Sequence, residues 1–141
     1  MDANELANLI AHEMLAGEGT GPAWGITIEE SREKYARVSM VVRSDMLNSH
    51  GIAHGGMVFA LADTAFAYVC NGANHATVAA QASIIFLDKA REGETLVAEA
   101  QEVERQGRTG VTRVSVRADD GRSIAEFTGY SRTVGGLVVE I

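Results

Sequence analysis

Apolar residues near the start of the chain have the spacing of a helix. Four of them fall on one face over residues 2–16, namely Leu6, Leu9, Ile10 and Met14. Asp2 and Glu5 have the spacing of a capping box, and Gly17 is a common helix terminator. The pattern therefore predicts a short helix over residues 2–16.

The next segment, residues 17–25, is rich in glycine and contains one large apolar residue, Trp24. Its composition predicts a connecting loop, with a flap over a pocket as the functional alternative. Strand-forming residues follow over 26–31 and 35–42, and the few charged residues between these segments predict a hairpin.

A continuous apolar run occupies residues 57–73 and is too long for one strand. It predicts a helix of about four turns that begins at the pair Gly55-Gly56 and ends near Gly72. Because the run is apolar on every side, we expect this helix to be buried all round.

Strand patterns dominate the second half of the chain, over residues 77–87, 95–105, 109–118 and 123–134. The turn signals between them are spaced as in an antiparallel meander. The expected fold class is α+β, with an antiparallel sheet of about six strands wrapped around one long central helix, because that arrangement buries the whole apolar surface of the helix.

Length and composition limit the class of protein. With 141 residues and 46% apolar content, the chain is expected to form one domain, residues 1–141. No apolar run is long enough to span a membrane and no secretory signal is visible, so we expect a cytoplasmic protein. Cys70 has no partner for a disulfide, and a net charge of −7 with scattered Lys and Arg argues against a nucleic-acid surface.

Asp63 is the only charged residue between Met57 and Cys70. A carboxylate is costly to bury unless it is paired, hydrogen-bonded or protonated. One interpretation is a structural aspartate that bonds a backbone group of a neighbouring strand. The other is a catalytic base or nucleophile whose reactivity is raised by partial desolvation. The residue pattern alone favours neither.

The motif His54-Gly55-Gly56 stands where the apolar helix is expected to begin, so its N–H groups would point out of the helix start. Such an end suits a developing oxyanion, and glycine lets a carbonyl group approach closely. Alternatively, the glycines only make a tight entry into the helix. His50 and His54 have a spacing found in metal sites, but no third ligand matches them and we expect no metal.

The positions of Gly55 and Asp63 on one helix predict a dimer. Eight residues at roughly 1.5 Å each separate their backbones by about 12 Å. Reacting atoms, however, must come within roughly 3.5 Å. If both residues act on one carbonyl, two subunits must place these helices antiparallel across a two-fold axis, with Gly55 of one facing Asp63 of the other. The symmetry then gives two equivalent sites.

Four segments resemble the hot-dog thioesterases: NSHGIAHGGMVFALADTAFAYVCN, SIIFLDKA, RQGRTGV and FTGYSRTVGG. The similarity extends from about residue 5 to residue 136 and is greatest to the phenylacetic acid degradation branch, which hydrolyses phenylacetyl-coenzyme A (CoA) and its hydroxylated forms. The resemblance implies that Asp63 is the catalytic carboxylate and that Gly55 supplies the oxyanion N–H. It also implies that Asn48 positions the thioester or the attacking water and that His54 supports the Gly55 loop.

The same resemblance implies tetramers built as a dimer of dimers, with active sites at the dimer interface and no cofactor beyond the CoA of the substrate. Lys89 replaces a proline that is common in relatives, and Ala79 and Gln81 occupy variable positions near the acyl group. These departures leave the acyl preference open.

CoA phosphates need local basic residues in an acidic protein. The candidates lie in predicted turns and are Lys89, Arg91, Arg105 and Arg108. Arg108 is the preferred choice, Lys89 is the second, and Gly56 is expected to lie against the substrate.

The expected function is hydrolysis of aryl-acetyl-CoA esters to the free acid and CoA. The alternatives are a thioesterase for other aromatic or medium-chain acyl-CoA, a non-catalytic acyl-CoA-binding module, and a hot-dog dehydratase, which needs a different arrangement of histidine and acid. We expect acyl-CoA as the partner, and neither nucleic acid nor a membrane.

Overall fold

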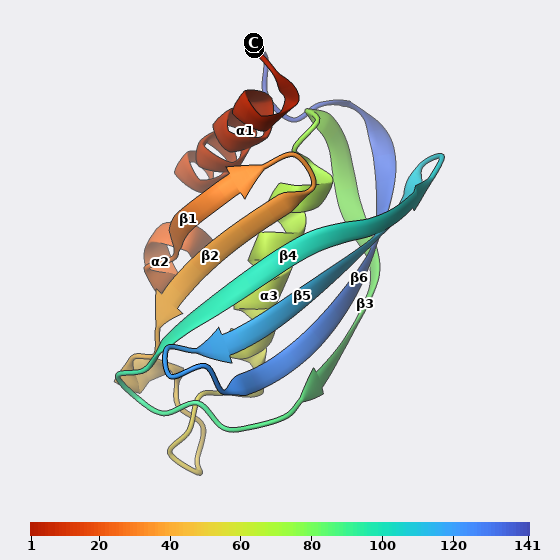
Figure 1. The fold of residues 1–141 in the computed structure, drawn as a ribbon. Coiled ribbons are helices and arrows are strands. Elements are labelled where there is room, and N and C mark those ends of the chain that lie inside the picture. Colours follow the sequence, from red (N-terminus) through yellow and green to blue (C-terminus); the bar gives the residue numbers. More distant parts are fainter.

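The computed structural model describes all 141 residues and shows a six-stranded antiparallel sheet curved around a long helix (Figure 1). The helices are α1 (Ala3–Gly17), α2 (Thr20–Trp24) and α3 (Gly55–Cys70), with a 3₁₀ turn at Ser44–Met46. The strands are β1 (Thr27–Arg32), β2 (Tyr35–Val41), β3 (His75–Phe86), β4 (Thr95–Gln106), β5 (Thr109–Ala118) and β6 (Ser123–Leu137). The predicted fold class is confirmed.

The strand order is β1-β2-β4-β5-β6-β3. Strands β4, β5 and β6 form the expected meander, but β3 does not pair with β4. It lies at the far edge, antiparallel to β6, so residues 87–94 form a crossover rather than a hairpin turn. The prediction of one continuous meander was wrong here, because a turn-rich segment does not show which edge its strands join.

The concave face of the sheet packs on α3, which contacts all six strands. Eight residues of this helix are buried: Val58, Leu61, Ala62, Ala65, Phe66, Tyr68, Val69 and Cys70. The expectation that α3 is buried all round was wrong. Gly56, Ala60, Asp63, Thr64 and Ala67 recur at helical spacing and form a partly exposed stripe.

The N-terminal helix α1 has the predicted capping box and covers β1 and one side of α3. The segment predicted as a loop contains α2, which ends at Gly25 in the left-handed conformation, φ 66°. The hydroxyl of Tyr68 donates a hydrogen bond of 2.8 Å to Glu18 just before α2. Gly21 is buried against α1, whereas most of residues 17–25 are exposed, and the flap interpretation stays a prediction.

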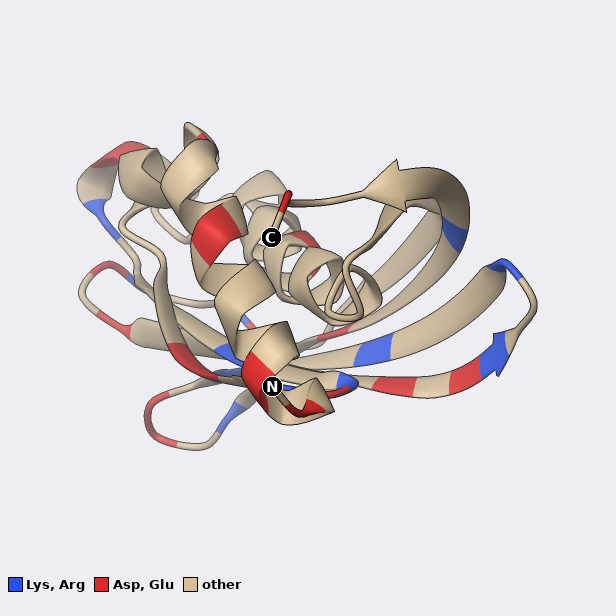
Figure 2. Cartoon of the chain, turned by 90° about the horizontal axis from the view of Figure 1, so that it is seen from above, with Lys and Arg blue, Asp and Glu red and all other residues tan.

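Charged residues are spread over the molecule, with Lys and Arg scattered among Asp and Glu along strands and turns (Figure 2). No helix is long and apolar enough to cross a membrane.

Gly129 of β6 lies directly against the ring of Phe66 on α3. A Cβ atom at this position would lie 2.7 Å from Cζ of the Phe66 ring. The same ring lies 5.7 Å from the ring of Phe127, which also packs on Phe59 at 5.3 Å. The absence of a side chain at Gly129 therefore sets the depth at which α3 sits in the sheet.

We predict that Gly129→Ala destabilises the fold by about 1–3 kcal/mol, as expected for overpacking a full core. Urea denaturation followed by circular dichroism measures the change. The control is Gly17→Ala at the end of α1, where an added Cβ meets no atom within 4 Å. Equal stabilities of the two variants would contradict the proposed role of Gly129.

Candidate active site

The start of α3 leaves one backbone donor free. His54 is the N-cap, and its Nδ1 accepts a hydrogen bond of 2.8 Å from the N–H of Gly56. The N–H groups of Met57 and Val58 donate to the carbonyl of His54. The N–H of Gly55 has no acceptor within the chain. This donor points out of the positive end of a 16-residue helix and can stabilise an oxyanion.

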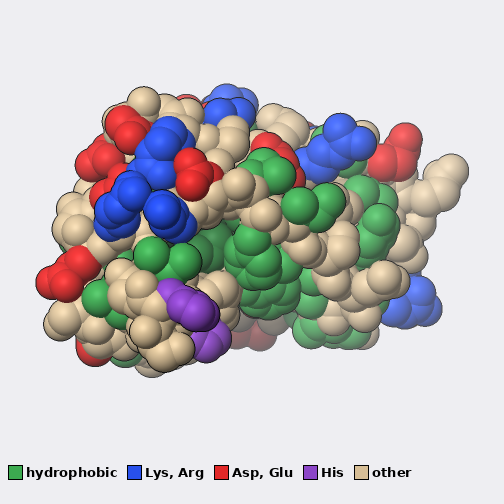
Figure 3. Space-filling view, turned by 90° about the horizontal axis from the view of Figure 1, so that it is seen from below, with side chains coloured by type: hydrophobic (Ala, Val, Ile, Leu, Met, Phe, Trp, Pro, Cys, Tyr) green, Lys and Arg blue, Asp and Glu red, His purple; other side chains and the backbone are tan.

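A cavity of about 240 Å³ lies beside this donor. Its lining residues are Asn48, Ile52, Ala53, Gly55, Val58, Phe86, Asp88, Lys89 and Ala90. The structure thus brings together three predicted site residues, Asn48, Gly55 and Lys89. Figure 3 shows this end of the molecule, where a band of hydrophobic side chains lies between histidines and a group of basic side chains.

Asn48 shapes the loop before the helix and keeps a donor for a ligand. Its Oδ1 accepts hydrogen bonds from the N–H groups of His50, at 2.9 Å, and Ile52, at 3.3 Å. No protein acceptor binds its Nδ2. The side chain can therefore hold the loop and donate into the cavity.

Gly55 also has a steric role. A Cβ atom there would lie 3.0 Å from Cζ of Phe86, the last residue of β3. A side chain at this position would therefore press on the Phe86 ring, which lines the cavity beside the Gly55 N–H. At Gly56, a Cβ atom would lie 3.0 Å from Nδ1 of His54 and would disturb the cap.

The crossover that carries Lys89 is tied to the helix start. The N–H of Ala53 donates to the carbonyl of Ala90 at 2.8 Å, directly before His54. Arg122 binds the same crossover through the carbonyl of Lys89, at 2.9 Å. It also forms ion pairs with Asp88, Glu94 and Asp120. These contacts fix the wall of the cavity.

Asp63 lies near the middle of α3 on the partly exposed stripe. Burial raises the pKa of its carboxyl group. The carboxylate has no hydrogen-bond partner and no ion pair in the chain, so the structural alternative, a bond to a neighbouring strand, is wrong. A half-buried carboxylate without a partner is a stronger base than an exposed one.

Gly55 and Asp63 lie on one uninterrupted helix, so the separation of about 12 Å inferred from their spacing applies. Within one chain they therefore cannot both reach one carbonyl carbon.

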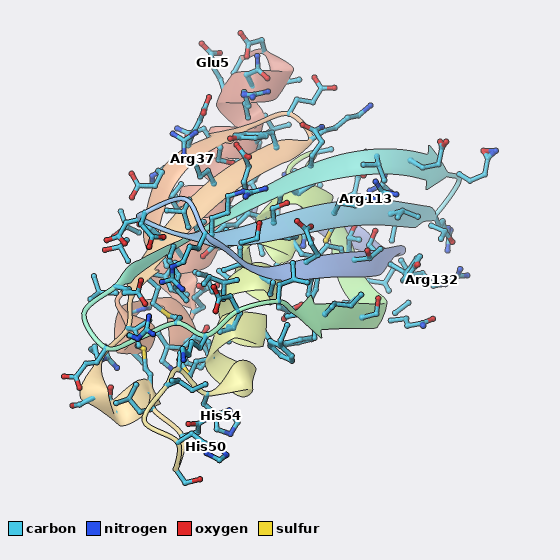
Figure 4. All side chains as sticks on the ribbon, turned by 60° about the horizontal axis from the view of Figure 1, so that its bottom comes forward. Glu5, Arg37, His50, His54, Arg113 and Arg132 are labelled. Atoms are coloured by element: carbon cyan, nitrogen blue, oxygen red, sulfur yellow. The ribbon has the colours of Figure 1, made fainter.

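Arg108 does not join the other predicted residues. It lies in the β4–β5 turn, on the rim of a second cavity of about 390 Å³ at the C-terminal end of α3. Figure 4 shows the two ends, with His50 and His54 on the loop before α3 and Arg132 at the opposite end. Arg108 and Lys89 can serve one ligand only if they come from different protomers.

The second cavity also contains polar residues that the sequence analysis did not identify as a site, among them Glu102, Arg105, Thr77 and Thr133. Arg105 was considered only for CoA phosphates, and its ion pair with Glu102 turns it inward instead. No group of three or more His, Cys, Asp or Glu side chains is placed to hold a metal ion.

A family model, related sequences and solved structures all place this chain in the same family. The thioesterase superfamily model matches residues 50–125. The acyl-coenzyme A thioesterase PaaI of Escherichia coli K12 is 42% identical over 129 residues, which cover 91% of this chain and 91% of that protein.

Solved structures agree with the sequence match. The E. coli PaaI protein from the phenylacetic acid degradation operon superposes with a TM-score of 0.94 at 38% identity, covering 96% of this chain and 99% of that one. A hypothetical thioesterase protein of Streptococcus pneumoniae TIGR4 solved with CoA gives a TM-score of 0.76 at 27% identity, covering 79% of this chain and 88% of that one. These matches agree with the free N–H at the start of α3 and the unpaired acid on the same helix. The family model and the similarity to PaaI show that this chain belongs to the thioesterase superfamily.

Proposed function

We propose that this thioesterase hydrolyses aryl-acetyl-CoA esters, with Asp63 as the catalytic carboxylate and the Gly55 N–H as the oxyanion donor. The observation that carries the proposal is the pairing of a half-buried, unpartnered carboxylate with a free backbone donor on the same helix. The similarity to PaaI of the phenylacetic acid degradation operon supports the acyl class. The CoA bound to the streptococcal relative supports the thiol part of the substrate.

The active site requires two subunits, with helices α3 antiparallel and Gly55 of one protomer facing Asp63 of the other. The exposed stripe on α3 supports this pairing, because its glycine and alanine residues allow two helices to approach closely. The outer edge of β3 also supports it. This edge has no partner strand, and four large apolar residues in β3 or directly after it are exposed: Val78, Ile85, Phe86 and Leu87. The tetramer built from two such dimers stays a prediction, as does the cytoplasmic location.

The chemistry needs only these groups and water. In one route Asp63 takes a proton from water as the water attacks the thioester carbonyl. In the other the carboxylate itself attacks and forms a mixed anhydride, which water then hydrolyses. In both, the Gly55 N–H binds the oxyanion, the C–S bond breaks, and the CoA thiolate leaves and takes up a proton. Single turnover in ¹⁸O-water separates the routes, because only the anhydride route puts label into Asp63.

The cavity beside Gly55 is the proposed entry for the pantetheine arm of CoA. Lys89 lines this cavity and is exposed, so its ammonium group can reach the phosphates. Arg108 lies at the other end of its own chain. We therefore place Lys89 ahead of Arg108 as the phosphate contact. His54 and Gly56 maintain the conformation of the first turn of α3 through their hydrogen bond.

Asp63→Asn is expected to lower the release of free CoA thiol from phenylacetyl-CoA by about 10²-fold or more, since general-base catalysis is worth 10²–10⁴-fold. Retention of more than about a tenth of the wild-type rate would refute the assignment. Wild-type protein that binds the ester without releasing thiol would instead indicate a binding module.

The stability of the same variant is the control. The ionised form of Asp63 destabilises the fold above its raised pKa, and asparagine removes this cost. The melting temperature of Asp63→Asn should therefore equal or exceed that of the wild type at pH 7. The difference should shrink as the pH falls through the raised pKa and the wild-type carboxyl takes up a proton.

Mixed dimers test the two-subunit site. Asp63→Asn and Gly55→Val should each be inactive, the second because its side chain meets Phe86. A heterodimer of the two has one site with both residues intact. Random mixing in equal amounts should therefore restore about a quarter of the wild-type activity. If tagged heterodimers form and stay inactive, the two-subunit site is wrong.

Lys89→Ala is expected to raise the KM for phenylacetyl-CoA roughly 5-fold with little change in kcat, as for the loss of an exposed charge pair of about 1 kcal/mol. The phenylacetyl thioester of N-acetylcysteamine has no phosphates, so its KM should not change. A higher KM in Arg108→Ala, with Lys89→Ala unchanged, would reverse our order of the two residues.

A further inference from the structure

Three acidic side chains converge on one guanidinium group beside the cavity at the start of α3. Arg122 lies in the β5–β6 turn, directly before β6, and its side chain reaches across to the segment between β3 and β4. It donates to Asp88 at 3.3 Å, to Asp120 at 2.8 Å and to Glu94. It also donates to the carbonyl of Lys89 at 2.9 Å, so four of its five N–H donors are in use.

Each of these three carboxylates is held by two different donors. One oxygen accepts a hydrogen bond from a backbone N–H, and the pairs are Lys89 with Asp88 at 2.8 Å, Arg91 with Glu94 at 2.6 Å, and Arg122 with Asp120 at 3.0 Å. The other oxygen accepts from the Arg122 guanidinium. Every oxygen of the three acids therefore already has a donor.

The three acids are charged at neutral pH. The Arg122 guanidinium lowers the pKa of Glu94 and of Asp120. The pKa of Asp88 is lowered by the N–H of Lys89 and by Arg122. One cation thus faces three carboxylates and partly neutralises each of them.

This arrangement leaves the basic side chains of the crossover unpaired. Lys89 and Arg91 are exposed, and neither forms an ion pair in the chain. Lys89 follows Asp88 directly, but the two oxygens of Asp88 are bonded to a backbone N–H and to Arg122. An ammonium group that has no carboxylate partner is available to a ligand phosphate.

The surface around the mouth of the cavity is rich in acids. Residues 88–94 and 119–122 contain five acidic and three basic side chains, and Asp88 lines the cavity next to Lys89. Figure 3 shows basic side chains bordered by acidic ones beside the hydrophobic band. CoA carries several phosphate charges, and like charges repel it within about 8 Å at physiological salt. Without Arg122, five acids would face two bases at this mouth.

We propose that Arg122 governs the affinity for CoA, because it neutralises the acids at the mouth of the cavity and leaves Lys89 free for the phosphates. This inference rests on the proposed thioesterase function and names a residue that controls the CoA end of the substrate. Arg122 touches no substrate atom. It is a positioning residue that acts through Asp88 and Lys89, so its effect falls on the binding of CoA and not on the chemical step.

A purely mechanical role of Arg122 would give different results. The crossover is bonded to the loop before α3 through Ala53 and Ala90, so a loosened crossover would move the Gly55 N–H and slow the turnover of any thioester. Loss of neutralisation acts only on a charged ligand and is screened by salt. A thioester without phosphates and a change of ionic strength therefore separate the two roles.

Arg122→Gln is expected to raise the KM for phenylacetyl-CoA about 10-fold at low ionic strength, with kcat nearly unchanged. Most of this rise should disappear at about 0.5 M salt. The KM for the phenylacetyl thioester of N-acetylcysteamine should stay at the wild-type value in both buffers. The matched control is Arg32→Gln, which removes an arginine paired with Glu30 at 3.1 Å on β1 and should leave every KM unchanged.

Asp88→Asn tests the same inference with the opposite sign, and it does not depend on the folding of the Arg122 variant. Asparagine keeps the acceptor for the N–H of Lys89 and removes one acid from the cavity wall. The KM for phenylacetyl-CoA should therefore fall about 2-fold at low ionic strength. Asp88→Asn added to Arg122→Gln should also recover part of the lost affinity. A mechanical role predicts no gain in either case, because the substitution weakens a contact of Arg122.

The outcomes distinguish this inference from the proposed function. If the wild-type protein hydrolyses both thioesters and Arg122→Gln raises both KM values alike, or raises neither, the inference is wrong and the proposed function stands. The same holds if salt does not restore the affinity of Arg122→Gln for the CoA ester. If the wild-type protein releases thiol from neither ester, the proposed function is wrong and the inference falls with it.

Discussion

The rigid spacing of Gly55 and Asp63 along α3 is the constraint on which the proposed active site depends. A straight helix cannot bring two of its own residues together across two turns, however the rest of the chain folds. The donor and the acid cannot meet within one chain, and in the proposed site they meet across a two-fold axis. The stripe that contains Asp63 is lined by small residues and is not covered by the sheet of its own chain, as the proposed pairing needs.

The rest of the fold holds α3 at a fixed depth and its first turn at a fixed position. The contact of Phe66 with the bare backbone of Gly129 sets the depth. The hydrogen bond from the N–H of Ala53 to the carbonyl of Ala90 fixes the loop that leads into α3. Arg122 holds the crossover of residues 87–94 in place through the carbonyl of Lys89. Rigid support of this kind is what a single oxyanion donor requires, because its effect depends on where it points.

The sequence predicted the elements well where one kind of spacing persists, as in α1, α3 and the strands of the meander. It failed where the outcome depends on distant partners. Nothing local in residues 87–94 shows that β3 joins the far edge of the sheet, and the glycines of residues 17–25 conceal α2. Asp63 and Gly55 were identifiable because a lone acid and a glycine pair stand out in an apolar run. The inward-facing ion pair of Glu102 and Arg105 was not, because both residues look like ordinary strand charges and Arg105 was considered only for the CoA phosphates.

A β-bulge in β4 decides which of its charged side chains, among them Glu102 and Arg105, point to the concave face of the sheet. The register against β5 shifts between Glu102 and Glu104, so that Glu102 faces Thr112 and Arg105 faces Gly110, both on the concave side. In a strand of regular alternation Glu104 would take the inner position and Arg105 would turn to solvent. Two acids would then line the interior in place of an acid and a base. The extra residue of this bulge therefore keeps the acid and the base on the same face of the sheet, where they form the ion pair that lines the second cavity.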